Sequence, residues 1–307
     1  MERFVKVEAL LRLQGVMFLF MVAGLFLRKK KYIPEETKGV LTELILDVIL
    51  PCNIITSFYI EFEKKILHQL LLVLVIAFLV QCVSLVFAHV TYWKYENVYR
   101  KPMQYATVCS NAGFLGTPIV QEVFGMTGVM YASVYLIPQR IFTWSVGLSF
   151  FTSKPDKKQM IKRVLTNPCI VSVYIGIIIM AAEIKLPMII DQSLQSASNC
   201  LTPVSMLLIG TILAEVKSIR ELFHMKLFLY SAIRLVVIPM IVWLSCRLLQ
   251  LDSVVAGVSV LLSGMPAPSA TSYLAARYHS DYIFATECVV FSTILSLFTI
   301  PVWCMFL

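Results

Sequence analysis

The sequence carries little charge and contains no long polar stretch. Only 14% of its 307 residues are charged and 59% are hydrophobic, whereas a soluble globular chain carries roughly 25% charged residues. The apolar excess runs from end to end, and no segment is polar enough to form a separate soluble domain. This composition argues against a soluble enzyme, a nucleic-acid-binding protein and a secreted disulfide scaffold.

Motifs for metal, nucleotide and catalytic chemistry are also missing. The eight cysteines lie singly in apolar segments and none forms a CxxC pair, so neither a zinc site nor a disulfide framework is predicted. There is no Walker A, HExxH or GxGD sequence, and no mid-span Ser/His pair at a recognisable spacing. We therefore predict no enzymatic activity, no cofactor, no metal site and no ATPase of the chain's own.

What is present is a series of long apolar segments. A membrane-spanning helix needs about 20 apolar residues, and the chain has room for about ten such helices with short connections. The expected fold is an all-α polytopic membrane protein. Its ten predicted spans are 7–27, 37–59, 66–90, 102–124, 127–151, 166–184, 187–214, 222–248, 253–278 and 282–306.

The net charge of +8 has a topological explanation. Most Lys and Arg residues fall in alternate connections, including Lys154–Arg163, which the positive-inside rule places in the cytoplasm. Both termini are then expected outside the membrane, and a nucleic-acid partner is not. Five spans precede this connection and five follow it, so the halves enter from opposite sides. We predict two inverted repeats, 1–151 and 166–307, joined by a cytoplasmic loop at 152–165.

Helix-breaking residues occur at matched places in the two halves. The fourth span of each half contains Ser110–Pro118 or Ser263–Ser269, and the second contains Pro51 with Asn53 or Pro203. Irregular backbone persists in a membrane only inside protein or beside a wet cavity. Paired interruptions therefore point to a transporter's mid-membrane binding site. The alternative is that these prolines only kink their helices.

An interrupted helix exposes backbone groups that can bind a ligand. The new N-terminus offers N–H groups and a positive dipole end suited to a carboxylate. The free carbonyls of the preceding half-helix can instead hold a cation. Asn111 supplies both a donor and an acceptor at the first break, or merely caps the second half-helix.

At these breaks the sequence resembles the auxin efflux carrier family, which comprises the plant PIN proteins and bacterial malate and malonate permeases. Four stretches carry the resemblance, in order along nearly the whole chain: Leu50–Ile55, Ser110–Pro118, Thr202–Gly210 and Met265–Ala270, with Ser292-Thr293 downstream.

The resemblance implies ten helices in two inverted repeats, with helices 4 and 9 crossing at Pro118 and Pro266. Helices 1, 2, 6 and 7 would form a scaffold, and helices 3–5 and 8–10 a mobile transport domain. Substrate would bind beside the crossing, at Asn111 and at neighbouring positions of the two broken segments. Those positions are Gly116, Pro118, Pro266, Pro268 and Ser269. The family and the absence of a transit peptide favour a bacterial plasma membrane.

Arg140 departs from the plant pattern, which has an uncharged residue at this place ahead of Trp144. A charge near the middle of a span needs a cavity or a partner. Arg140 is expected either to hold a substrate carboxylate or to pair with an acid such as Glu287. Arg234 is expected to pair with Glu287 or Glu215.

Three further polar side chains within spans are candidates for proton or cation coupling, namely Asp47, Gln81 and Glu287.

The favoured function is secondary transport of small organic anions by alternating access. Monocarboxylates and dicarboxylates such as malate, malonate or an auxin-like acid are the expected substrates. Proton or sodium coupling and a homodimer are further expectations. The alternatives are a cation/proton antiporter of related crossed-helix architecture, and a channel or sensor that uses the same fold. Substrate, direction of flux, coupling ion and oligomeric state are not specified by the sequence.

Overall fold

Every regular element in the described part of the chain is a helix, as expected for an all-α protein. The computed structural model describes residues 2–34, 37–60, 64–152, 157–215, 224–278 and 280–307. The α-helices are α1 (Glu2–Lys29), α2 (Thr37–Leu44), α3 (Leu50–Ser57), α4 (Lys64–Tyr92), α5 (Asn97–Val108), α6 (Thr117–Phe142), α7 (Lys157–Leu165), α8 (Pro168–Ala181), α9 (Met188–Asn199), α10 (Leu201–Leu213), α11 (Met225–Ala232), α12 (Ile238–Leu248), α13 (Ser253–Ser263), α14 (Ala270–Arg277) and α15 (Tyr282–Phe306).

In the described residues, four short π-helices, in which hydrogen bonds run between residues five apart, adjoin these α-helices. They are η1 (Ile45–Ile49), η2 (Ala112–Gly116), η3 (Thr143–Gly147) and η5 (Ile233–Val237). Each of the ten predicted spans contains helix, and α7 occupies much of the connection expected as a loop at 152–165.

Six helical runs in the described residues are long and apolar enough to cross a membrane. They are Thr37–Ser57, Lys64–Tyr92, Asn97–Gly147, Met188–Leu213, Met225–Leu248 and Tyr282–Phe306. Two further apolar helices, α8 and α13, are shorter. The helical membrane character expected from composition is therefore present, and the ten-span inverted repeat stays a prediction.

The chain forms two compact units. Unit 1 contains Met1–Leu71, Gly113–Val134 and Leu165–Glu215. Unit 2 contains Leu72–Ala112, Tyr135–Val164 and Val216–Leu307. Helices α4 and α6 each contribute to both units, and the units are described separately below.

Unit 1 is built on close contact between α1 and α10. A β-carbon added to Gly24 would lie 2.1 Å from the Leu207 carbonyl oxygen, and one added to Gly210 would lie 2.0 Å from the Met21 carbonyl oxygen. Neither distance can accommodate a side chain. The two glycines therefore let each helix backbone pack directly on the other, which is how small residues stabilise helix pairs in membranes.

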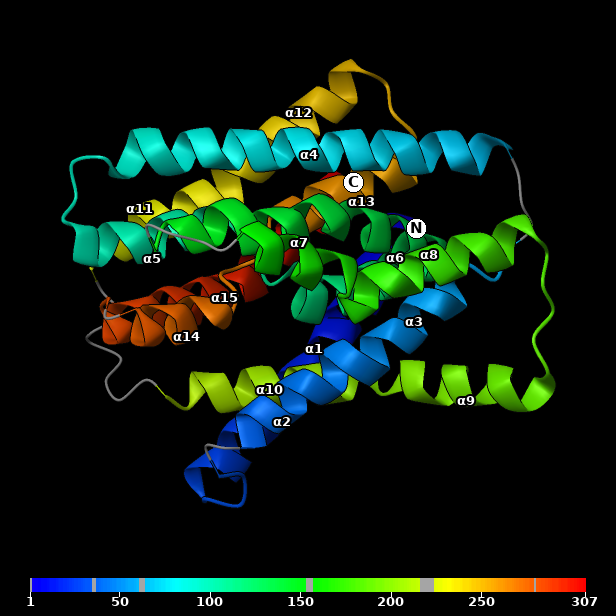
Figure 1. Ribbon diagram of the computed structural model, residues 1–307, viewed down its shortest axis with the longest axis horizontal. Coiled ribbons are helices and arrows are strands. Elements are labelled where there is room, and N and C mark those ends of the chain that lie inside the picture. Colours follow the sequence, from blue (N-terminus) through cyan, green and yellow to red (C-terminus); the bar gives the residue numbers. More distant parts are fainter. Residues whose placement is uncertain (1, 35–36, 61–63, 153–156, 216–223, 279) are drawn as a thin grey trace. The chain divides into compact units, whose positions relative to one another are not determined.

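Two of the predicted breaks in unit 1 are not located at their prolines. The helices α2, η1 and α3 run on as one rod (Figure 1), with Pro51 as the second residue of α3. The π-helical turn before it is closed by the Leu50 N–H, which donates to the Ile45 carbonyl. Pro51 and Asn53 therefore do not interrupt helix 2, because the widened turn accommodates the missing proline N–H.

The interruption predicted at Pro203 is also displaced from its proline, and it lies between α9 and α10. The two helices run nearly end to end in Figure 1 and are separated by Cys200 alone. Pro203 is the third residue of α10, within the first turn, where a missing N–H removes no intrahelical bond. The interruption lies before the proline.

Gly125 interrupts α6 in unit 1. Its φ of 64° and ψ of −158° are not helical, so α6 consists of two helical segments that meet at this residue. Glycine reaches a positive φ without the steric penalty that a β-carbon brings. The two segments on either side therefore change direction at a position where only glycine fits without strain.

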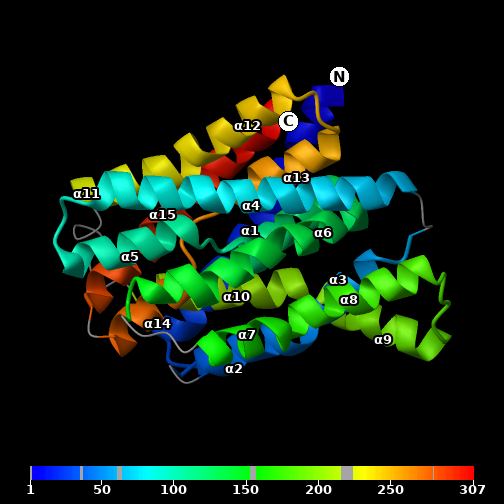
Figure 2. The same ribbon diagram turned by 45° about the horizontal axis from the view of Figure 1, so that its top comes forward.

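Unit 2 packs α5, α11, α13 and α14 around α15. Its core includes the buried side chains of Tyr105, Val108, Phe151 and Leu274. The helices α11, η5 and α12 follow one another along one rod (Figure 2). The non-helical segments of the expected binding site, 109–111 and 264–269, lie in this unit.

Candidate functional site: a crossing of two interrupted helices

Both predicted breaks in unit 2 are present. α5 ends at Val108, and Cys109 has an extended backbone with φ −100° and ψ 139°. The next helical turn is η2, which begins at Ala112. α13 ends at Ser263, and helical structure resumes only with α14 at Ala270.

The two non-helical segments touch through their backbones. The Asn111 N–H donates to the Pro266 carbonyl at 2.8 Å, and both residues are buried. Within unit 2, Asn111 is therefore the residue of the first break that bonds to Pro266, and the crossing at Pro118 and Pro266 stays a prediction. Pro118 is the second residue of α6 in unit 1, where the first helical turn tolerates proline.

Arg234 holds the two interrupted helices together. Its side chain is 1% exposed. Its Nε donates to the Met265 carbonyl at 2.9 Å and its Nη1 to the Thr107 carbonyl at 3.0 Å. Thr107 lies in the last turn of α5, and Met265 is the second residue beyond the end of α13. These are the places where helical carbonyls lose their intrahelical donors and the dipole is negative.

The predicted carboxylate partners of Arg234 are thus wrong. Within the described residues its hydrogen bonds go to carbonyl oxygens, and Glu215 instead accepts from Lys38 Nζ at 2.6 Å within unit 1. A guanidinium suits two separate carbonyls because its donors point in fixed, divergent directions. The positions of acidic residues in the sequence could not reveal this role of Arg234, because its hydrogen-bond acceptors are backbone atoms.

The helix that carries Arg234 has its own compensation for a proline. Pro239 lacks the N–H that would donate to the Leu235 carbonyl four residues earlier. The indole Nε1 of Trp303, from α15, donates to that carbonyl at 2.8 Å. The π-helical segment η5 and this bond position Arg234 in the interior of unit 2.

Two polar side chains satisfy the remaining backbone of the breaks. Gln139 Nε2 donates to the Ser110 carbonyl at 2.6 Å, and Gln139 Oε1 accepts from Ser110 Oγ at 3.0 Å. Ser292 Oγ accepts from the Ala267 N–H at 3.1 Å. The sequence had marked Ser292 only through the family resemblance and had missed Gln139. The position of Gln139 beside Arg140, in the middle of a predicted span, could have indicated that it belongs to the site.

Arg140 and Asn111 retain capacity to bind a ligand. Arg140 is half-buried, and its Nη1 atom is buried with no hydrogen-bond partner in the described residues. No ion pair joins it to an acid within those residues. The Asn111 side chain is 6% exposed and makes no hydrogen bond to the described part of the chain. The paired bonds between Ser110 and Gln139 bring the neighbouring residues Asn111 and Arg140 to the same region of unit 2.

The other predicted site residues are dispersed. Pro268 and Ser269 are half-buried at the end of the second break, just before α14. Gly116 is buried in unit 1 as the last residue of η2. The side chain of Trp144 lies outside the described residues.

The coupling candidates differ in environment. Asp47 is exposed on η1. Gln81 is buried in α4, and its Oε1 has no hydrogen-bond partner in the described chain. Glu287 is 8% exposed in α15 and lines a cavity of about 300 Å3 in unit 2 with Lys226 and Asp281. Among the described residues, no three His, Cys, Asp or Glu side chains are grouped to hold a metal ion.

Comparison with known proteins gives a consistent result. Residues 13–163 and 157–304 match the model of a family described as membrane transport protein. A protein of Methanothermobacter thermautotrophicus named an uncharacterized transporter is 25% identical over 91% of this chain and 92% of its own length. An uncharacterized transporter of Methanocaldococcus jannaschii is 21% identical over 94% of this chain and 96% of its own.

Proposed function

Because the chain belongs to the membrane transport protein family, the auxin efflux carriers identified from its motifs, we propose that it is a secondary transporter of small organic anions. Monocarboxylates and dicarboxylates such as malate or malonate are the proposed substrates, bound at the crossing in unit 2 and moved by alternating access. The plasma membrane is the proposed location, with both termini outside.

The observation that carries the choice of an anion is the position of Arg234. Free carbonyls at interrupted helices can hold a cation, but here a resident guanidinium bonds to the carbonyls of Thr107 and Met265. The Arg234 guanidinium therefore already occupies the carbonyl oxygens at these helix ends that could otherwise bind a cation. The guanidinium of Arg140, with an unpartnered Nη1, is left as a donor for a carboxylate.

Asn111 and the start of α14 supply the rest of the proposed site. The amide of Asn111 can donate to one substrate oxygen or accept from a substrate hydroxyl. α14 begins at Ala270, directly after the second break, so its positive dipole end favours negative charge there. An arginine fork with an amide and a helix N-terminus matches a carboxylate in both charge and geometry.

The two compact units support a two-body transport mechanism. Unit 2 contains the crossing together with most of the predicted transport-domain helices, and unit 1 contains the predicted scaffold helices. The assignment differs in one segment, because Gly113–Val134 belongs to unit 1. Proton or sodium coupling and a homodimer remain part of the proposal as first expected.

A cation/proton antiporter is the second candidate and has less support. Such a protein needs an acidic side chain at the crossing, and among the described residues the charged group there is Arg234. A channel or sensor would need no unpartnered arginine near the breaks.

The test is uptake by proteoliposomes of radiolabelled malate, malonate and indole-3-acetate. Arg140→Gln keeps a polar side chain and removes the charge. A hydrogen bond to a charged group contributes about 1.5–3 kcal/mol, which corresponds to a roughly 10- to 150-fold loss of uptake at low substrate concentration.

Arg247→Gln is the matched control, because Arg247 is an exposed arginine of the same unit. It should transport as well as wild type. Equal uptake of every acid by wild type and Arg140→Gln would remove Arg140 from the binding site.

A further inference from the structure

A second candidate binding site lies wholly within unit 1. It is a cavity of about 530 Å3, within the range of small-molecule sites. Its wall consists of the end of α3, the α6 residues on both sides of Gly125, the connection between α8 and α9, and α9 itself. None of the residues used above for the crossing lines it.

One face of α9 is polar where it borders this cavity. Asp191, Gln195 and Ser198 follow one another at helical spacings of four and three residues, which places them on one side of the helix. α9 belongs to a run that is long and apolar enough to span a membrane. Asp191 is half-buried in the first turn of α9 and Ser198 is buried, so these polar side chains line the cavity instead of an apolar core.

A buried asparagine fixes two of the lining side chains. Asn53 is fully buried, and its Nδ2 donates to Gln121 Oε1 at 3.0 Å and to Ser198 Oγ at 2.8 Å. Its Oδ1 atom is buried without a hydrogen-bond partner in the described chain. Three elements, α3, α6 and α9, are thereby held in a defined arrangement around the cavity.

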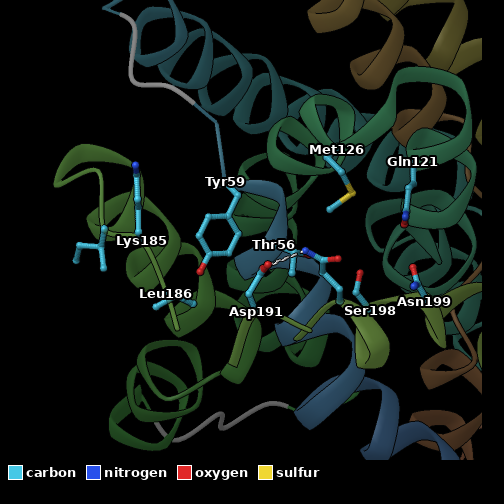
Figure 3. A pocket seen from close by; sticks show the side chains of 11 residues that line it. Thr56, Tyr59, Gln121, Met126, Lys185, Leu186, Asp191, Ser198 and Asn199 are labelled. Atoms are coloured by element: carbon cyan, nitrogen blue, oxygen red, sulfur yellow. Dashed lines mark hydrogen bonds between the residues drawn. The ribbon is translucent and has the colours of Figure 1, made fainter. Parts of the chain in front are cut away.

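The opposite end of the cavity is rich in hydrogen-bond acceptors. Both oxygens of Asp191 accept from Gln195 Nε2 at 3.0 Å. The Tyr59 hydroxyl is buried without a partner among the described residues, and Tyr59 lines the cavity together with Asp191. Figure 3 shows Tyr59 and Asp191 at one end and Gln121 with Asn199 at the other.

Lys185 does not neutralise this carboxylate. Its amino group points away from Asp191 in Figure 3, and no ion pair joins the two within the described residues. Asp191 therefore leaves a negative charge at one end of the cavity, beside a phenol oxygen that can accept a further hydrogen bond.

We propose that this cavity binds a small ligand with an ammonium group, held by the carboxylate of Asp191 and the hydroxyl oxygen of Tyr59. An ammonium offers three donors and no acceptor, which complements a carboxylate and a phenol oxygen. Gln121 and Ser198 hold a polar group at the far end of the ligand. The site is opposite in charge preference to the anion site proposed in unit 2, and it does not depend on that proposal.

The experiment is calorimetric titration of the full chain in lipid nanodiscs with putrescine and, separately, with 1,4-butanediol. The two probes have the same carbon chain and differ in their terminal groups. Putrescine should bind at least tenfold more tightly than the diol. Asp191→Asn should weaken putrescine binding at least tenfold, while the matched control Glu122→Gln, which removes an exposed carboxylate beside Gln121, should leave it unchanged.

Three outcomes would overturn the proposal: no putrescine binding, equal affinity for the diol, or an undiminished affinity of a folded Asp191→Asn protein. If Asp191→Asn fails to fold, Tyr59→Phe and the comparison of the two probes on wild type still decide. Because the readout is amine binding and not anion uptake, this proposal and the transport proposal can fail independently.

Discussion

Replacement of Arg234 is the most informative perturbation of the fold around the crossing. Arg234→Met keeps a long side chain and removes both donors, so the carbonyls of Thr107 and Met265 lose the partners they have at 3.0 Å and 2.9 Å. A buried acceptor left without a donor costs about 1–3 kcal/mol. Interhelical hydrogen bonds in a membrane protein average about 0.6 kcal/mol, with a maximum of about 1.7.

The two scales bracket the expected loss. Methionine also relieves the burial of a charge, which offsets part of the cost, so a net loss of about 2 kcal/mol in the free energy of unfolding is expected. Thermal unfolding in detergent should then shift downward by about 3 °C, because the entropy of unfolding of a chain this long is large. Arg234→Lys should shift by roughly half as much, because one ammonium is a point charge that cannot reproduce the divergent fork.

The control for this series is Arg247→Met, which changes an exposed arginine of the same unit. It should unfold at the wild-type temperature. If Arg234→Met also unfolded there, the two carbonyls would need no donor from Arg234, and the bridging role described for the crossing would be refuted.

Two further predictions concern backbone packing in unit 1. Gly24→Ala and Gly210→Ala should each lower the unfolding temperature, because either β-carbon would overlap a carbonyl oxygen of the facing helix, and overpacking of this kind costs about 1–3 kcal/mol. Gly15→Ala is the control, because a β-carbon added to Gly15 meets open space, and it should be neutral or slightly stabilising. Gly125→Ala should destabilise by about 1–2 kcal/mol because of the positive φ, and an unchanged unfolding midpoint would contradict the observed backbone at that residue.

The sequence predicted the broken helices well where irregular residues follow one another over a long stretch. The breaks at Asn111 and Pro266 needed several consecutive residues unsuited to a helix, and both are present. Pro51 and Pro203 were wrongly predicted to interrupt their helices, because a single proline near the start of a helical segment removes no bond that the helix requires. Sequence alone does not show where a segment starts.

The partners of buried side chains were the least predictable part of the site. Arg234 was expected beside an acid, yet its acceptors are backbone oxygens, whose availability depends on which helices end together. Likewise, Asp191 and Gln195 lie near the start of the predicted span 187–214, and no role was predicted for them from the sequence. Only the packing of α9 against α3, with Gln121 and Met126 of α6 completing the wall, reveals that they border a cavity.

The central claim, transport of organic anions, is tested most directly by counterflow in proteoliposomes. Vesicles loaded with unlabelled malate or malonate are diluted into the same labelled acid, with protein-free vesicles alongside. The account predicts transient accumulation of label that depends on the protein and saturates with the acid. No protein-dependent exchange of any carboxylate tried, combined with sodium/proton exchange in the absence of organic acid, would contradict it and favour the antiporter.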